Sequence, residues 1–357
     1  MKIMSIFGTR PEIIRLSRIF PLLDANFQHV MVNTNQNFTP ELNSIFFSEL
    51  SIRKPDYTLK IKTGQFGTEV AEIISQTEKI IIKEKPDVML ILGDTNSGLS
   101  AIVAAHYGIK IVHLEAGMRA YDFRMPEDKN RTLIDHLSSI LLPYTNYSRE
   151  NLIRENIHPS KIYTIGNPII EVIEHYMPQI NKSTILQKLK LKKNNYFLVT
   201  AHRSENVDNI KSLKNILSGL EKIHKKFNKK IIYPIHPRTL SKIKNIMIPN
   251  GIKLIDSLGF FDFTNLEKNA FCVLTDSGTV PEEMLYFQKP SVTIREYTER
   301  PEIIEAGSNI LSGLNPENML RATESITAGK PDWEWNKVLG DGKTARKVIN
   351  ILHGKMY

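Results

Sequence analysis

The sequence predicts an α/β protein that contains two doubly wound parallel sheets. Three observations predict this fold. Short apolar runs alternate with helical patterns along most of the chain. Two similar turns, one in each half, follow directly after such runs. The length of 357 residues, of which 41% are hydrophobic, allows two sizeable cores and is long for one ordinary domain.

The first half of the chain reads as a series of strands and helices, which is typical of a parallel sheet covered by helices. Strands are short apolar runs, and helices are segments with an apolar residue every three or four positions. The expected elements are strand 2–7, helix 11–23, strand 29–33, helix 69–84, strand 87–92, helix 98–106, strand 110–114, helix 128–139, strand 140–142 and helix 148–155.

The second half repeats this pattern after an interruption. Polar and basic residues at 179–195 break the periodicity, and we place the linker between two lobes there. The expected elements that follow are strand 196–200, helix 210–227, strand 230–235, helix 237–246, strand 253–255, helix 262–268, strand 271–275, helix 280–287 and strand 291–294.

Two turns of the same design stand at the end of a strand in each half. They read Gly8-Thr9-Arg10-Pro11-Glu12 and Gly278-Thr279-Val280-Pro281-Glu282. The glycine permits a tight turn, the threonine can cap the next helix, the proline fits its first turn, and the glutamate closes a capping box. Backbone N–H groups at such a helix start suit phosphate. The pair predicts a ligand held between two facing lobes.

Composition excludes several classes of function. No run of eighteen apolar residues occurs, and Met1-Lys2 leads directly into an apolar strand, so we expect a soluble cytoplasmic protein with no membrane contact. The single Cys272 excludes an internal disulfide framework, and its apolar surroundings predict a buried structural thiol. The net charge of +9 is spread through helices and loops without interleaved aromatic residues, which argues against nucleic acid as a partner.

Reactive side chains recur directly after the predicted strands. In open parallel sheets, ligands bind outside the carboxyl ends of the strands. Any one of these residues could be a solvated turn or a helix cap, but their coincidence at one edge of each sheet indicates a site. The residues are Asp94, Glu115, Arg119, His202, Arg203, His236, Asp276, Ser277, Gly278, Arg295, Glu299 and Arg300.

Eight short motifs, in order and at similar spacing, give the chain a resemblance to the non-hydrolysing UDP-N-acetylglucosamine 2-epimerase family. They cover nearly the whole chain and are the segments 8–12, 93–95, 113–119 (His-Leu-Glu-Ala-Gly-Met-Arg), 126–131, 166–167, 202–203, 275–278 and 298–302. The resemblance implies the GT-B arrangement, with two Rossmann-like lobes and a nucleotide sugar in the cleft between them. It also implies a homodimer and a C-terminal helix, at about 343–357, that packs back on the first lobe. The lobes would then be 1–178 and 179–342.

The chemistry implied by this resemblance is inversion at C2 of a UDP-2-acetamido sugar, with UDP-N-acetylglucosamine ranked first. UDP leaves by anti elimination, a glycal intermediate forms, and UDP adds back after a proton reaches the opposite face. No redox cofactor and no metal are implied. Such a path needs a clamp for UDP, acid and base groups on both sides of the sugar, and a site closed to water.

By position in the family motifs, the catalytic residues would be Asp94, Glu115, Glu127 and His202. UDP and sugar would be bound by Arg10, Arg15, Arg131, Ser277, Gly278, Thr279, Glu283 and Arg300, with Arg15 where the family usually has lysine. Structural alternatives stay open. Asp94 could be a helix cap and His202 a turn histidine. Glu115 and Glu127 could pair with Arg119 or Arg131, and Arg10 and Arg300 with Glu12 and Glu302.

The chain differs from the family pattern at several positions, which limits how far the roles known in the family can be assigned to its residues. Thr279 and Pro281 replace residues that are usually glycine and glutamine. A regulatory site for a second substrate molecule would use Gln36, Gln65, Arg203 and His236, but Asn37 and Thr39 differ from the family pattern, so we do not expect substrate activation. The segment 119–126 is short, as in relatives that make UDP-N-acetyl-L-fucosamine or act on a diacetamido uronic acid. A GT-B glycosyltransferase and a hydrolysing epimerase are further alternatives.

Overall fold

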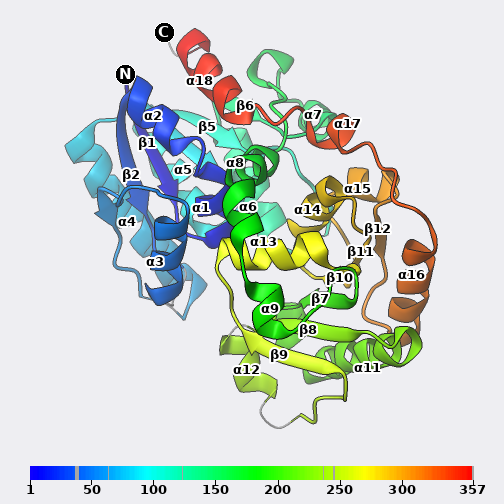
Figure 1. Cartoon of the computed structure of the whole chain (residues 1–357). Coiled ribbons are helices and arrows are strands. Elements are labelled where there is room, and N and C mark those ends of the chain that lie inside the picture. Colours follow the sequence, from blue (N-terminus) through cyan, green and yellow to red (C-terminus); the bar gives the residue numbers. More distant parts are fainter. Residues whose placement is uncertain (37–39, 63, 123, 236, 244–245, 356–357) are drawn as a thin grey trace. The chain divides into compact units, whose positions relative to one another are not determined.

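The computed structural model describes residues 1–36, 40–62, 64–122, 124–235, 237–243 and 246–355, and it divides into two compact units (Figure 1). The first unit comprises Met1–His175 and Leu339–Tyr357, and the second comprises Tyr176–Val338. The C-terminal segment therefore returns to the unit in which the chain begins. Within the described ranges, no helix has the length and apolar character needed to cross a membrane.

The first unit is built on six parallel strands in the order β3-β2-β1-β4-β5-β6. Its strands are β1 (Lys2–Phe7), β2 (Gln28–Asn33), β3 (Tyr57–Thr58), β4 (Val88–Leu92), β5 (Lys110–Leu114) and β6 (Ile140–Leu142). Its helices are α1 (Arg10–Leu16), α2 (Phe20–Asn26), α3 (Pro40–Glu49), α4 (Phe66–Glu84), α5 (Ala101–His106), α6 (Pro126–Leu137), α7 (Asn146–Arg154), α18 (Thr344–Lys355), and the 3₁₀ turns η1 (Asn96–Ser100) and η2 (Pro159–Lys161). Two further helices cross the boundary between the units: α8 (Pro168–Lys182) belongs to the first unit before Tyr176, and α17 (Trp335–Leu339) belongs to the second unit except for Leu339.

The second unit repeats this architecture with six parallel strands in the order β12-β11-β10-β7-β8-β9. Its strands are β7 (Tyr196–Thr200), β8 (Lys230–Ile235), β9 (Ile252–Asp256), β10 (Cys272–Thr275), β11 (Ser291–Thr293) and β12 (Asn309–Leu311). Its helices include α9 (Ile185–Leu189), α10 (Ser204–Val207), α11 (Ile210–Phe227), α12 (Pro237–Ile243), α13 (Phe260–Asn269), α14 (Val280–Phe287), α15 (Pro301–Glu305) and α16 (Pro316–Ala328).

Each sheet has a point at which the strand order reverses. In the first unit, β1 lies between β2 and β4, and in the second, β7 lies between β8 and β10. Consecutive crossovers leave such a central strand in opposite directions, which opens a crevice at its carboxyl end where α/β proteins bind ligands. The predicted site residues follow β1, β4 and β5 in one sheet and β7, β10 and β11 in the other. They therefore lie at or beside these reversal points.

The apolar strand patterns account for the cores. Strand residues such as Ile6, Val32 and Met89 are fully buried and pack with Ile134 of α6 in the first unit. In the second unit, Val199, Leu274 and Val292 pack with Ile216 and Leu220 of α11. The near-continuous apolar character of the strands follows from helices that cover both faces of a parallel sheet.

Two predicted segments differ in detail from the structure. The single helix at 11–23 is divided into α1 and α2, because Pro21 lacks an N–H and its ring would clash within a continuous helix, so that a new helix starts at Phe20. The predicted linker at 179–195 contains the end of α8 and all of α9. Ile185, Leu186 and Leu189 pack there in an apolar cluster of the second unit, while Lys188 and Lys190 are exposed to solvent.

Candidate active site

Asp94 and Glu115 lie side by side at the carboxyl edge of the first sheet. They follow β4 and β5, which are adjacent, parallel and in a register that pairs Leu92 with Leu114. Gly93 donates its backbone N–H to the carbonyl oxygen of Leu114 at 3.0 Å, which ties the two strand ends together. Two acidic residues that the sequence separates by 21 positions therefore share one edge.

Two buried arginines hold these carboxylates. Arg131 donates from Nη2 to Asp94 and, at 3.2 Å, to Oε1 of Glu115. Arg15 donates from Nη1 to the second carboxylate oxygen, Oε2, of Glu115. Both arginine side chains are 2% exposed, whereas that of Asp94 is 16% exposed. The two arginines and the two carboxylates therefore neutralise one another away from bulk water. Each of these charges has an oppositely charged partner.

The backbone at this edge is strained. Glu115 has a φ of +66°, a conformation that residues with a Cβ rarely adopt. The neighbouring Gly117 has a φ of +78°, and a Cβ added there would lie 2.2 Å from the carbonyl oxygen of Ser148. Strain of this kind persists only where the surroundings fix the conformation, and it clusters at functional sites.

Helix α6 carries a stripe of charged residues toward this edge. Glu127, Arg131 and Asp135 are spaced four residues apart and therefore share one face of the helix. Arg131 contacts Asp94 and Glu115, which places Glu127 on the same face, one turn nearer the helix start. Sequence analysis singled out Glu127 and Arg131 but missed Asp135. The spacing of four along one helix is the signal that could have found it.

The alternative in which Glu115 pairs with Arg119 is wrong. Arg119 donates to Asp135 at 2.7 Å and to both oxygens of Glu155 at 2.8 and 2.7 Å. Burial alone would lower the pKa of Arg119, but these carboxylates outweigh it and raise the pKa. The alternative pairing of Glu115 with Arg131 does occur.

The first Gly-Thr turn forms the predicted capping box. Glu12 accepts from the N–H groups of Gly8 at 2.8 Å and Thr9 at 2.6 Å and from the hydroxyl of Thr95 at 2.8 Å, next to Asp94. Burial raises the pKa of Glu12 to about 6 despite these hydrogen bonds. Gly8 is required for space, since a Cβ there would lie 2.0 Å from the hydroxyl of Thr34. Glu12 therefore ties the end of β1 to the turn after β4.

Arg10 does not pair with Glu12, so the structural alternative given for Arg10 is wrong. Its guanidinium lies over the ring of Phe46, with 5.7 Å between the guanidinium carbon and the ring centroid. Burial lowers the pKa of Arg10. The side chain is half-buried at the carboxyl end of β1, near the reversal point of the sheet.

In the second unit, Asp276 organises the turn that carries His202. Its buried carboxylate accepts from the backbone N–H groups of His202 at 3.0 Å and Arg203 at 2.9 Å and from the side chain of Asn206 at 3.0 Å. Nδ1 of His202 lies 3.6 Å from Oδ1 of Asp276, and the His202 side chain is 46% exposed. The backbone of His202 is thus fixed while its ring reaches solvent.

The second turn differs from the first. Ser277 accepts from the N–H of Thr279 at 3.2 Å, and Thr279 itself has helical backbone angles with no side-chain cap. The predicted capping box at Thr279 and Glu282 is therefore wrong. Glu282 instead accepts from Nε of Arg300 at 2.7 Å, which draws its carboxylate away from the helix start.

Arg300 packs directly over Gly278. A Cβ at Gly278 would lie 2.4 Å from Nη1 of Arg300, so the position needs glycine for close approach. Burial alone would lower the pKa of Arg300, but Glu282 and Glu299 outweigh it and raise it. Arg300 and Gly278 are therefore neighbours in space, as residues that bind one diphosphate would be.

Glu283, on α14, lies beside a second buried acid. Glu283 is 7% exposed, and Glu267 on the neighbouring helix α13 is fully buried. Burial and the carboxylate of Glu283 raise the pKa of Glu267 well above its usual value. Sequence analysis did not single out Glu267, which lies between Leu266 and Lys268 in a predicted helix.

The residues predicted for a regulatory site are only partly described. Gln36 donates to Glu69 at 3.0 Å and accepts from Ser97 at 3.1 Å, and Gln65 is exposed at the start of α4. Arg203 belongs to the second unit and donates from Nε to the carbonyl oxygen of Asp276 at 3.0 Å. His236, like Asn37 and Thr39, lies outside the described residues.

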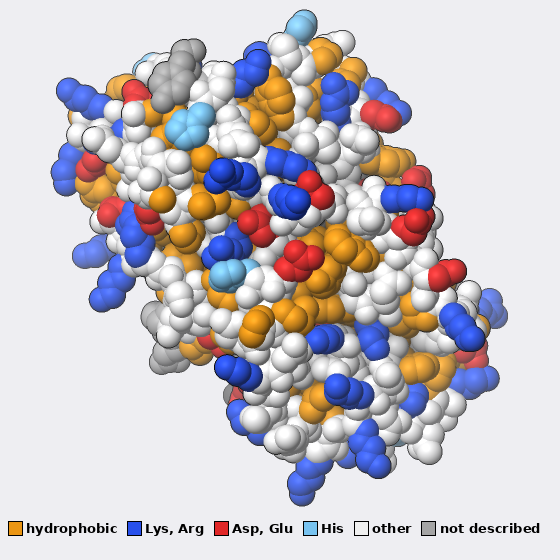
Figure 2. Space-filling view, turned by 45° about the horizontal axis from the view of Figure 1, so that its top comes forward, with side chains coloured by type: hydrophobic (Ala, Val, Ile, Leu, Met, Phe, Trp, Pro, Cys, Tyr) orange, Lys and Arg blue, Asp and Glu red, His pale blue; other side chains and the backbone are white. Residues whose placement is uncertain are grey.

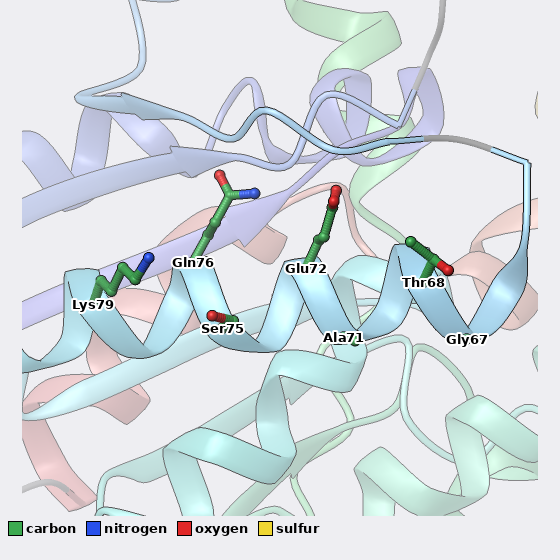
Figure 3. Close-up of a pocket in the computed structure, with 7 residues that line it drawn as sticks. All are labelled: Gly67, Thr68, Ala71, Glu72, Ser75, Gln76 and Lys79. Atoms are coloured by element: carbon green, nitrogen blue, oxygen red, sulfur yellow. The ribbon is translucent and has the colours of Figure 1, made fainter.

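A pocket along α4 is lined by side chains of that helix alone, and none of the predicted site residues lines it (Figure 3). Gln76 there holds the backbone of Lys60 through two hydrogen bonds. Lys and Arg side chains are dispersed over the face seen in Figure 2. Among the described residues, no group of three His, Cys, Asp or Glu side chains is placed to hold a metal, and Cys272 is buried.

Comparison with known proteins places the chain in a family. The family model described as UDP-N-acetylglucosamine 2-epimerase matches residues 23–353. A UDP-N-acetylglucosamine 2-epimerase of Methanococcus maripaludis is 40% identical over 99% of both chains. A UDP-2,3-diacetamido-2,3-dideoxy-D-glucuronate 2-epimerase of Pseudomonas aeruginosa is 32% identical, also over 99% of both.

A solved structure agrees with these sequences. The crystal structure of Methanocaldococcus jannaschii UDP-GlcNAc 2-epimerase in complex with UDP-GlcNAc and UDP has a TM-score of 0.93 and 40% identity, and the match covers 99% of both chains. This similarity confirms the predicted fold class, with two Rossmann-like lobes as in the GT-B-like epimerases. The chain belongs to the UDP-N-acetylglucosamine 2-epimerase family.

Proposed function

We propose that the chain interconverts UDP-N-acetylglucosamine and UDP-N-acetylmannosamine, as an isomerase that needs no cofactor. The observation that carries this proposal is the buried cluster in which Arg131 contacts both Asp94 and Glu115. Acid and base catalysis at a sugar carbon needs carboxyl groups held on fixed backbone and supported by hydrogen bonds. Full-length relatives that bear the name of this activity support the proposal.

The reaction has two balanced steps. In the first, a base removes the proton from C2 while the bond between C1 and the UDP oxygen breaks, which leaves a 2-acetamidoglucal and UDP. In the second, an acid delivers a proton to the opposite face of C2, and UDP returns to C1. Asp94, Glu115 and Glu127 supply these acid and base groups. The charge that develops on departing UDP needs cationic and backbone N–H partners.

The second unit supplies most of the UDP-binding residues. Ser277, Gly278 and Thr279 form the turn at the start of α14, and the start of a helix favours phosphate. Arg300, stacked against Gly278, adds positive charge. Glu283 accepts hydrogen bonds from the ribose hydroxyls, and His202 acts near the pyrophosphate and the sugar. From the first unit, Arg10 and Arg15 complete the set.

The decisive experiment is incubation with UDP-N-acetylglucosamine in deuterated water, followed by NMR. Removal and return of the C2 proton predicts deuterium at C2 of both epimers. The variants Asp94→Asn, Glu115→Gln and Glu127→Gln are expected to lower turnover at least about 100-fold, because each loses acid or base function. Asp122→Asn is the matched control, since Asp122 pairs with the exposed Arg124 outside this cluster. Wild-type rates in all three variants would overturn the assignment.

The same assay separates the competing functions. The relative from Pseudomonas aeruginosa makes a diacetamido uronic acid the second candidate substrate, and UDP-N-acetyl-L-fucosamine and its C2 epimer complete the panel. Deuterium that enters only one of these sugars identifies it as the substrate. Free N-acetylmannosamine as the product would indicate a hydrolysing epimerase. Turnover that depends on an added acceptor would indicate a glycosyltransferase.

Assembly and location form the last part of this proposal. We expect a homodimer that acts in the cytoplasm, where UDP sugars are made and used. Exposed apolar side chains on three neighbouring helices of the first unit, α4, α5 and α6, support a dimer. The side chains are Ile82, Ile102 and Leu133.

A further inference from the structure

His113 occupies an unusual position beneath the candidate catalytic residues. It lies in β5, two residues before Glu115, and is fully buried. Nδ1 lies 2.7 Å from Oδ1 of Asp135, and Nε2 lies 2.8 Å from the carbonyl oxygen of Gly93. Both ring nitrogens are therefore engaged, and the reaction proposed above makes no use of this ring.

Both partners of His113 are acceptors. A backbone carbonyl such as that of Gly93 has no proton to give. Asp135 already accepts at Oδ2 from the N–H of Gly117 at 3.1 Å and from Arg119 at 2.7 Å, as an ionised carboxylate does. Burial alone would raise the pKa of Asp135, but His113 and Arg119 outweigh it and lower it.

A neutral imidazole cannot satisfy this geometry. It has one N–H and one lone pair, so one nitrogen would place its lone pair against an acceptor at hydrogen-bond distance. With no exposure to solvent, water cannot relieve that contact. The doubly protonated ring gives both nitrogens a proton and removes the conflict.

We propose that His113 carries a proton on both ring nitrogens and, through the two hydrogen bonds that these protons make, positions Asp94 and Glu115 for the reaction. The Gly93 carbonyl belongs to the peptide bond that leads to Asp94, so its hydrogen bond to Nε2 fixes that turn. Through Asp135, the same ring fixes the N–H of Gly117, two residues after Glu115. His113 is a positioning residue, and the claim that it serves catalysis rests on the proposed function.

His113 belongs to a chain of ion pairs that runs to the surface. The described ionisable groups joined to it in this way are Asp135, Arg119, Glu155 and, at the solvent end, His136, whose Nε2 lies 3.5 Å from Glu155. The side chains of His113, Asp135 and Arg119 are buried, whereas that of Glu155 is 24% exposed.

His29 provides a matched control in the same unit. Its Nδ1 lies 2.7 Å from Asp24, and its Nε2 lies 2.8 Å from the hydroxyl of Ser5. A hydroxyl can donate as well as accept, so a neutral His29 satisfies both contacts. Burial lowers the pKa of His29, which agrees with a neutral ring.

The first test is the protonation state of each ring, measured by ¹⁵N NMR on the intact protein labelled at histidine. In the folded protein at neutral pH, His113 is expected to show two protonated nitrogens and His29 one, because both partners of His113 accept hydrogen bonds. An unprotonated nitrogen on His113 would overturn the proposal. This measurement needs no substrate, so its outcome is independent of whether the epimerase assignment holds.

The second test separates positioning from simple stability. His113→Gln keeps a donor near the Gly93 carbonyl, whereas His113→Asn keeps one only toward Asp135. We expect kcat to fall about 100-fold in His113→Asn and less in His113→Gln, with KM nearly unchanged, because small displacements of reacting groups cost about that much. His29→Asn should retain wild-type kcat. Equal kcat in His113→Asn and the wild type would contradict the positioning role.

Discussion

Glu12 shows how one buried carboxyl joins two turns of the site. It takes part in the capping box of α1 and also holds Thr95, beside Asp94. The residue type and spacing predicted the capping box, but the contact with Thr95 depends on the packing of β1 against β4. Burial raises the pKa of Glu12 from its ordinary 4.5 to about 6, so ionisation opposes folding there.

This shift predicts a pH dependence of stability. A carboxyl with a raised pKa in the folded state contributes stability below its unfolded pKa and loses it as the pH rises through the folded value. Between about pH 4.5 and 6, this group should reduce the free energy of unfolding by about 2 kcal/mol. Denaturant titrations of the wild type and Glu12→Gln across that range measure the difference. Parallel profiles for the two proteins would contradict the prediction.

Gly278 gives a second prediction at the level of single residues. A Cβ added there would lie 2.4 Å from Nη1 of Arg300, whose side chain Glu282 holds. We expect Gly278→Ala to displace Arg300, to cost about 1–3 kcal/mol of stability, and to weaken UDP binding. Gly67→Ala is the control, because nothing lies within 4 Å of the added methyl and the residue is in a helix. Calorimetric titration with UDP measures the loss of binding, and denaturation measures the loss of stability. If Gly278→Ala binds UDP and unfolds like the wild type, Arg300 does not approach Gly278 as closely as described.

At the level of elements, apolar runs bounded by polar residues predicted the sheet strands well. Strands 2–7, 110–114, 140–142, 196–200 and 230–235 and helices 210–227 and 280–287 agree with the structure to the residue. In these segments, the spacing of the apolar residues alone indicates where each element begins and ends. The prediction failed where tertiary packing decides, as in α9, a five-residue helix with only one lysine whose apolar residues pack against the second core.

The candidate site could also be predicted in part from the sequence. The rule that ligands bind after parallel strands located Asp94 and Glu115, because the rule depends on topology alone. It could not show which arginine pairs with which carboxylate. Arg119 is four residues from Glu115 yet pairs with Asp135 and Glu155, whereas Arg15, one hundred residues away, contacts Glu115. These partners are set by the packing of α1 and α6, which local sequence does not encode.

Helix α18 gives a prediction at the same level. It lies beside α2 in Figure 1, with Leu352 fully buried and Ala345 donating its N–H to Glu171 at 2.8 Å. Leu352→Ala should cost about 2–5 kcal/mol, the usual effect of a cavity in a close-packed core. Asn350→Ala, on the exposed face of the same helix, should cost far less. Chemical denaturation compares the two, and equal stabilities would show that α18 does not pack as described.

At the scale of the whole molecule, the two units share one plan. In each sheet, the first strand of the unit, β1 or β7, lies in the centre, at the point where the strand order reverses. Candidate site residues follow these central strands. The proposed division of chemistry follows this plan, with the candidate acid and base groups in the first unit and most of the proposed UDP-binding residues in the second. The sequence spreads the net charge of +9 through helices and loops, and Lys and Arg side chains are dispersed over the face seen in Figure 2.

The exposed apolar side chains of the first unit predict its assembly. Ile82, Ile102 and Leu133 are 55%, 41% and 41% exposed on the neighbouring helices α4, α5 and α6. A stable interface buries roughly 800 Å² on each partner and is apolar at its centre, so a charge placed there opposes association. We expect the wild type to be a dimer by light scattering and Ile102→Glu to be a folded monomer at micromolar concentration. Ile210→Glu, at a position that is 63% exposed on α11 of the second unit, should remain dimeric. A monomeric wild type, or a dimer that survives Ile102→Glu and Leu133→Glu together, would show that this surface is not the interface.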